Sequence, residues 1–113
     1  MSEITDKDFL AHIREAMKRT ASYTEQMTYE EFLEDIKTQD AVIRNIEIIG
    51  EAIKNLSEAL RSRYTEIPWK NMAGMRDKLI HHYFGVNFSI VWKVAKEELP
   101  KIINHIEKII EIE

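Results

Sequence analysis

An apolar residue recurs every three or four positions through the middle of the chain, and this spacing constrains the fold most strongly. Alternating steps of four and three residues place these side chains on one face of an α-helix for about five turns. A face that is apolar over this length must be covered by other helices or by a second copy. The pattern therefore predicts a central packing helix, whose apolar positions are Val42, Ile46, Ile49, Ile53, Leu56 and Leu60.

Two earlier segments carry helix start signals. Thr5 and Asp6 can cap a first helix, because their side-chain oxygens accept hydrogen bonds from free backbone N–H groups. Thr28 and Glu31 have the spacing of a capping box, which should open a short second helix through about Ile36.

Two later helices are predicted from proline, glycine and asparagine. Pro68 suits the first position of a fourth helix, and Gly85 is a plausible stop for it. Asn87 can cap a fifth helix, which Pro100 should interrupt and kink, because proline removes a backbone donor. The apolar stripe of this last helix comprises Val91, Ala95, Leu99, Ile102, Ile106 and Ile109.

Composition agrees with one compact helical domain over residues 1–113. The chain is 44% hydrophobic and 32% charged, with three glycines and two prolines, which excludes a low-complexity or disordered protein. Its apolar runs are too short to span a membrane, and the lack of cysteine fits a cytoplasmic location. The predicted fold class is all-α, an antiparallel bundle of about five helices.

The charge is uneven along the chain, although the net value is only −4. Residues 61–82 contain five basic and two acidic residues, whereas residues 1–60 contain seven basic and thirteen acidic ones. A local basic segment can hold a polyanion on an acidic protein, because near charges count more than screened distant ones. A solvated helix face explains the same pattern. The candidate phosphate contacts in this segment are Arg61, Arg63, Lys70 and Lys78, and His82 is a further candidate for an RNA contact.

A cluster of chemically capable residues ends the basic segment. Arg76, His81 and Tyr83 fall within about two helical turns. Arginine stabilises charge on a phosphate and histidine moves protons near neutral pH, so the pair suits cleavage of RNA by its own 2′-hydroxyl without a metal or cofactor. Asp77 lies one turn before His81 and can orient its ring. Adjacent histidines at 81 and 82 could instead bind a metal, but neighbours on a helix point about 100° apart.

The geometry of a regular helix leaves one question open. Arg76 and Tyr83 would lie nearly above each other, but His81 would point about 140° away from Arg76. Either the helix ends near His81, or a second copy across a two-fold axis completes the site.

Several blocks of the sequence together resemble the HepT-like branch of the HEPN superfamily. They comprise residues 41–52 (AVIRNIEIIGEA), Ile67-Pro68-Trp69, the stretch from Arg76 to Tyr83, and Gly85-Val86. The resemblance implies a HEPN-like homodimer with the motif at the subunit interface. It also implies a metal-independent ribonuclease that acts as the toxin of a toxin–antitoxin pair, on targets such as tRNA or mRNA.

Site roles follow from the same resemblance. It implies that Arg76 and His81 are catalytic, and that Asp77 is the polar residue after the arginine. It also implies that Tyr83 receives AMP from a cognate minimal nucleotidyltransferase, the antitoxin. The neighbouring His82 leaves open which histidine reaches the phosphate. Aligning Tyr83 with the tyrosine of the family motif favours His81.

A second function class competes with this one. The chain could be a non-catalytic helical subunit that docks a nucleotidyltransferase and presents a substrate or nucleotide to it. Trp69 and Trp92 could stack on bases, although helical spacing favours a place in the core. His12 and His105 are expected at or near the surface.

Overall fold

The computed structural model describes residues 4–79 and 85–113, except for the side chains of Arg76 and Lys78, and these ranges form an all-α fold without a β-strand. None of the described helices combines the length and the apolar character needed to cross a membrane. The elements are α1 (Asp6–Thr24), α2 (Tyr29–Glu34), α3 (Ile36–Asn55), α4 (Glu58–Arg63), α5 (Trp69–Ala73), α6 (Met75–Leu79), α7 (Phe88–Lys93), the π-helical turn η1 (Val94–Glu98) and α8 (Leu99–Ile112).

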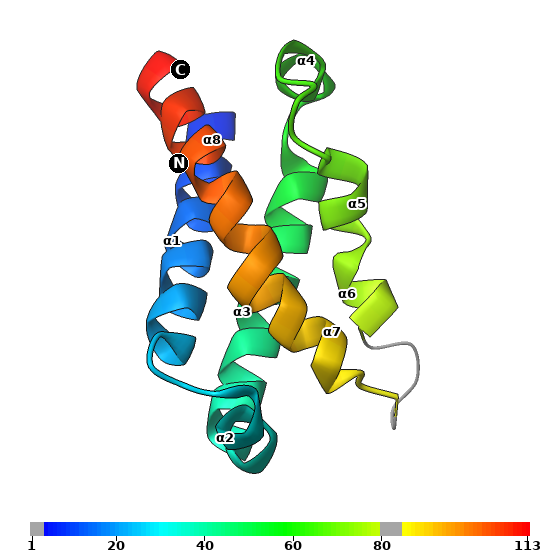
Figure 1. Cartoon of the computed structure of the whole chain (residues 1–113). Coiled ribbons are helices and arrows are strands. Elements are labelled where there is room, and N and C mark those ends of the chain that lie inside the picture. The colour runs from blue at the N-terminus through cyan, green and yellow to red at the C-terminus, as the bar shows by residue number, and fades with distance from the viewer. Residues whose placement is uncertain (1–3, 80–84) are drawn as a thin grey trace.

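Helix α3 lies at the centre of the fold, as the apolar stripe predicted. It runs antiparallel to α1 and also contacts α2, α5, α6 and α7 (Figure 1). The continuous path of α7, η1 and α8 crosses in front of α1 and α3 (Figure 1). The buried apolar positions of α3 are Val42, Ile46, Ile49, Ala52 and Ile53, all at most 4% exposed.

The predicted helix caps at three positions are confirmed. Thr5 and Thr28 each form a capping box, with Asp8 and Glu31 respectively. The Asn87 side chain accepts the Ile90 N–H at 3.2 Å and opens α7. These caps are local motifs, which explains why the sequence alone reveals them.

The central helix is shorter at its C-terminal end than its apolar spacing predicts. It ends at Asn55, and the backbone of Leu56 is extended, with φ −67° and ψ 144°. Ser57 then caps a separate helix, α4, by accepting the Leu60 N–H at 3.1 Å. Leu56 and Leu60 are still buried, so the burial prediction was right and the predicted continuity was wrong.

The predicted fourth helix is divided as well. Pro68 is the residue before α5 rather than its first position, and a turn at Gly74 separates α5 from α6. The count of about five helices is therefore not reproduced. The short pieces still follow one another along α3, at the right of Figure 1.

Gly50 lets the end of α5 approach α3 closely. A Cβ atom at this position would lie 3.3 Å from the Ala73 carbonyl oxygen and 3.7 Å from that of Met72. Both of these atoms belong to backbone, which cannot move aside as a flexible side chain can. The absence of a side chain at Gly50 therefore sets the distance between the central helix and α5.

Pro100 does not stand inside a regular α-helix. The Leu99 N–H bonds to the Val94 carbonyl five residues earlier, so the α-helical hydrogen-bond ladder is already interrupted at η1. Pro100 then occupies the first turn of α8, where a missing N–H costs little. The interruption therefore lies before Pro100, at the π-helical turn, and not at the proline as predicted.

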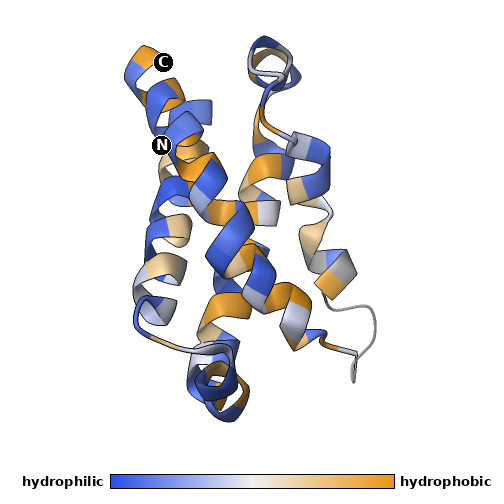
Figure 2. Ribbon diagram, viewed as in Figure 1, coloured by the Kyte–Doolittle hydropathy of each residue, from blue (hydrophilic) through white to orange (hydrophobic). Residues whose placement is uncertain are grey.

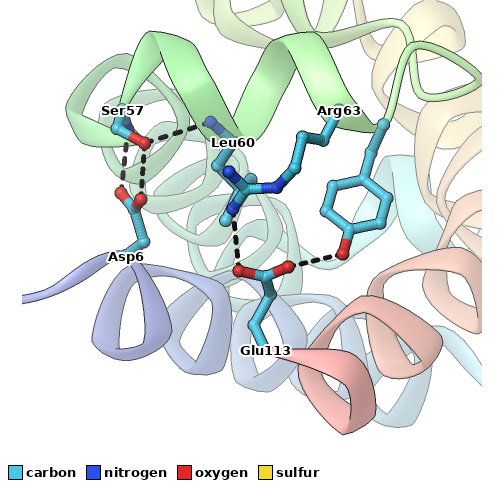
Figure 3. A network of polar contacts seen from close by, with 6 residues as sticks. Asp6, Ser57, Leu60, Arg63 and Glu113 are labelled. Carbon is cyan, nitrogen blue, oxygen red and sulfur yellow. Dashed lines mark hydrogen bonds and ion pairs between the residues drawn. The ribbon is translucent and has the colours of Figure 1, made fainter.

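Polar contacts fasten the α4 segment to residues near both ends of the chain, which lie at the same end of the bundle (Figures 1 and 3). Asp6 accepts hydrogen bonds from the Ser57 N–H at 2.8 Å and from the Ser57 hydroxyl at 2.5 Å. Glu113 accepts from Arg63 at 2.8 Å and from the Tyr64 hydroxyl at 2.5 Å. These contacts join segments about fifty residues apart and hold α4 over the end of the core.

The contact between Tyr64 and Glu113 shifts both groups. The Tyr64 hydroxyl, with help from Arg63, holds the pKa of the Glu113 carboxyl below its ordinary value of 4.5. The same hydrogen bond raises the pKa of Tyr64 above 10.0. The contact is therefore strongest with an ionised carboxylate and a protonated phenol.

We expect Gly50→Leu to destabilise the fold. Overpacking against backbone costs about 1–3 kcal/mol, which exceeds the helix-propensity gain of under about 1 kcal/mol. Urea unfolding measures the difference. Gly74→Ala is the matched control, because its Cβ would meet nothing closer than 3.5 Å at a negative φ. Equal losses in both variants would contradict the proposed close approach.

We expect Tyr64→Phe to lower the thermal midpoint at neutral pH. The lowered pKa of Glu113 contributes stability that is present above pH 4.5 and lost as pH falls further. The raised pKa of Tyr64 contributes stability that is present below pH 10.0 and lost as pH rises further. The gap between wild type and variant should therefore shrink at both extremes. Tyr29→Phe, which removes a hydroxyl from another half-buried tyrosine, should show no such pH dependence.

Candidate functional site

The structure describes part of the predicted motif. Asp77 is exposed on α6, and Lys70 is exposed on α5. Arg76 and Lys78 belong to α6, and their side chains lie outside the described part of the molecule. The remaining predicted site residues, which are His81, His82 and Tyr83, fall within residues 80–84 and also lie outside it.

Both flanks of residues 80–84 are anchored. Leu79 is fully buried at the end of α6, and its carbonyl oxygen accepts the Asn87 N–H at 3.3 Å. Asn87 in turn caps α7, and Val86 packs against the core. One backbone hydrogen bond therefore joins the two flanks of residues 80–84. No local sequence pattern predicted this pairing of residues eight positions apart.

Helix α5 determines the position of α6, the helix that carries Arg76. The Trp69 indole N–H donates to the Tyr64 carbonyl oxygen at 2.9 Å, and Trp69 is only 7% exposed. The prediction that Trp69 belongs to the core is confirmed. The Gly74 carbonyl accepts the Asp77 N–H at 3.1 Å and starts α6 directly after α5. The close approach at Gly50 thus transmits the position of α3 to the helix that carries Arg76.

Trp92 has a more open position than Trp69. It is half-buried on α7 and packs against Phe32 of α2, with ring centroids 5.1 Å apart. The Lys96 ammonium lies 5.3 Å from the Trp92 ring and donates to the Thr24 carbonyl at 2.8 Å. Trp92 therefore joins α2 to α7.

His12 and His105 are both exposed, as predicted.

An apolar groove of about 240 Å³ lies beside the motif helix. One side of the groove is formed by α5 and α6, and the other side is formed by α7, η1 and α8. Ile90 is 39% exposed at its edge. The apolar residues that line it are Pro68, Met72, Met75, Leu79, Ile90, Val94 and Ile102.

The predicted basic segment is only partly available for a ligand. Arg63 pairs with Glu113 at 2.8 Å, so its charge is engaged within the fold. Arg61 is half-buried on α4, whereas Lys70 is exposed one helix closer to the motif. Charge counting could not distinguish these cases, because the partner of Arg63 lies fifty residues away in the sequence.

Within residues 4–79 and 85–113, no cluster of three or more His, Asp or Glu side chains has the arrangement of a metal site. The chemistry that the predicted residues offer is that of a guanidinium, an imidazole and a phenol. Such a set can bind a phosphate and transfer a proton.

Comparison with known proteins gives one consistent family. The sequence profile described as Ribonuclease HepT-like matches residues 13–109, a range that includes the whole stretch from Arg76 to Tyr83. No solved structure gives a significant match.

Similar proteins come from archaea and bacteria. "Putative RNase MJ0127" of Methanocaldococcus jannaschii is 53% identical over 90% of this chain and 84% of its own length. "Probable ribonuclease HepT" of Thermococcus cleftensis is 48% identical over 91% of this chain and 94% of its own. "Putative RNase TTE0752" of Caldanaerobacter subterraneus is 38% identical over 96% and 97% respectively. The profile and these relatives agree, and the chain belongs to the HepT-like ribonuclease family.

Proposed function

We propose that this protein is a metal-independent endoribonuclease and the toxin of a toxin–antitoxin pair. The observation that carries the proposal is the family match, which spans the complete Arg76 to Tyr83 stretch. The names of the relatives point to RNA as the substrate. We expect one functional domain over residues 1–113, acting on tRNA or mRNA in the cytoplasm.

The proposed reaction is attack of a ribose 2′-hydroxyl on the adjacent phosphorus. His81 takes the proton from the 2′-oxygen as the new P–O2′ bond forms, and the imidazolium of His81 formed in this way gives a proton to the departing 5′-oxygen as the P–O5′ bond breaks. Arg76 binds the non-bridging oxygens, whose charge increases in the transition state. The products are a 2′,3′-cyclic phosphate and a 5′-hydroxyl, so no water is consumed in this step.

We propose that the active form is a homodimer with the motif at its interface. A regular helix would separate Arg76 and His81 by about 140°, and a two-fold partner can supply the missing group. The groove beside α6 supports this arrangement, because a second copy could cover Ile90, which is 39% exposed at the edge of the groove. In this arrangement Asp77 orients His81, while Lys70, Lys78 and His82 contact the RNA backbone.

We propose that a cognate minimal nucleotidyltransferase inactivates the protein by transferring AMP to Tyr83. The phenol oxygen attacks the α-phosphorus of ATP, and pyrophosphate leaves. Each added phosphate brings negative charge next to Arg76, so it would repel RNA and occupy the arginine.

We expect Arg76→Ala and His81→Ala each to reduce RNA cleavage in EDTA by about a hundredfold or more, because each removes a transition-state interaction. The measurement is cleavage of a labelled RNA by purified, unmodified protein, with analysis of the product ends. His82→Ala should retain most of the activity. Intact complex formation with the nucleotidyltransferase but no cleavage by the wild type would instead support the non-catalytic subunit.

We expect co-expression with the cognate nucleotidyltransferase to increase the intact mass of the wild type in steps of one AMP. Tyr83→Phe should keep its unmodified mass, because it lacks the accepting oxygen. Tyr64→Phe, in which another tyrosine hydroxyl is removed, should be modified like the wild type. An unshifted wild-type mass, or modification of Tyr83→Phe, would contradict the assignment.

A further inference from the structure

A surface at the α2 end of the bundle combines exposed apolar side chains with acidic ones. Two shallow hollows meet there, and they share Met27 and Glu31 as lining residues. The apolar members are Tyr23, which is 43% exposed, Met27, which is half-buried, and Ile36, which is 71% exposed. We call these residues and the acidic residues described next the α2 surface. Figure 2 shows hydrophobic and hydrophilic residues intermixed around α2.

The acidic residues of the α2 surface make its lining negatively charged. They are Glu25, Glu31, Glu34 and Asp35, and no lysine or arginine lines either hollow. Glu31 accepts the Thr28 N–H at 2.9 Å, so its position is fixed by the capping box. Asp35 accepts hydrogen bonds from Thr38, which hold the pKa of this carboxyl below its ordinary value. The surface is therefore negatively charged at neutral pH.

This combination selects the chemistry of a binding partner. Lys37 places one positive charge near Asp35, and the four carboxylates outnumber it, so RNA and anionic membranes are repelled. An apolar residue such as Ile36, most of which faces water, gains from being covered. Both features are satisfied by a protein face that presents Lys or Arg around an apolar contact.

The α2 surface is linked by packing to the flank of the catalytic motif. Phe32 of α2 is fully buried and contacts Phe88 at the start of α7, with ring centroids 6.3 Å apart. Phe88 follows Asn87, whose N–H bonds to the Leu79 carbonyl and joins the two flanks of residues 80–84. Figure 1 shows α2 and the start of α7 at the same end of the bundle. A partner seated on α2 would thus lie against the helix that begins just after Asn87, the C-terminal flank of residues 80–84.

We propose that the α2 surface is the docking site for the nucleotidyltransferase, through a basic face of that enzyme with an apolar centre. This inference rests on the proposed function, because it names the surface that brings the modifying enzyme to Tyr83. RNA cleavage by the free protein does not depend on it.

The test is isothermal titration of the full chain with the purified cognate nucleotidyltransferase. Glu25→Lys/Glu34→Lys reverses two exposed charges for which the structure gives no hydrogen bond, and it should weaken binding by about tenfold or more. Ile36→Ser should weaken it by several-fold, and added salt should weaken binding of the wild type. None of these variants should change RNA cleavage by the unmodified protein.

Matched controls lie elsewhere on the molecule. Ile112 is 70% exposed, nearly the same as Ile36, and Ile112→Ser should bind like the wild type. Glu15→Lys/Glu111→Lys makes the same charge change at two exposed acidic residues outside the α2 surface, and should also bind normally.

Three outcomes overturn the inference. Equal affinity of the α2-surface variants and their controls would overturn it alone and leave the proposed function standing. A change in the oligomeric state of Glu25→Lys/Glu34→Lys, with unchanged binding of the enzyme, would assign the surface to contacts between copies of this chain. If the wild type forms no complex with the nucleotidyltransferase, both this inference and the proposed antitoxin are overturned. The RNA-cleavage assay would then test the proposed ribonuclease activity independently.

Discussion

Burial of the apolar face of α3 is the constraint on which the other elements depend. The side chains of this face are almost completely removed from water, because α1 and several later helices cover them. They are Val42, Ile46, Ile49 and Ile53. Each buried aliphatic side chain contributes about 1.5–3 kcal/mol, so this face is a large share of what stabilises a small domain. The short helices α2, α5, α6 and α7 have little intrinsic stability and are ordered by docking onto α3. The position of α6, and with it the backbone of Arg76, follows from this docking through the contact at Gly50.

The elements that the sequence predicts well are those encoded locally. Capping boxes at Thr5 and Thr28 and the cap at Asn87 need only residues three or four positions apart. Burial of the α3 stripe follows from periodicity alone. The break at Leu56 does not, because Leu56 and Leu60 keep the helical spacing across it. The contacts that accompany the break include the pair of Asp6 and Ser57, which are 51 residues apart in the sequence.

The candidate site divides in the same way. The chemical capability of Arg76 and His81 is a property of residue type, and the resemblance to a family supplied their roles. The scaffold around them depends on contacts that no sequence pattern encodes, namely the approach of Ala73 to Gly50 and the bond between Leu79 and Asn87. Helical periodicity gives an angle between two side chains only while the helix continues. The division of the predicted fourth helix at Gly74 illustrates how readily that assumption fails.

The π-helical turn at Val94–Glu98 has a consequence for how the last helix can vary. The apolar positions Val91, Ala95 and Leu99 are separated by two successive steps of four, which would drift by about 40° per step around a regular α-helix. The wider turn absorbs this drift, so that the apolar positions of α8 remain directed at α1. Deleting one residue from the turn would restore ordinary helical winding with little rotation of α8, because a π-helical turn holds one residue more than an α-helical turn. Ile102, Ile106 and Ile109 would then remain directed at the core, so a deletion of one residue should be better tolerated in this turn than elsewhere in the helix, where it would rotate the following residues by about 100°.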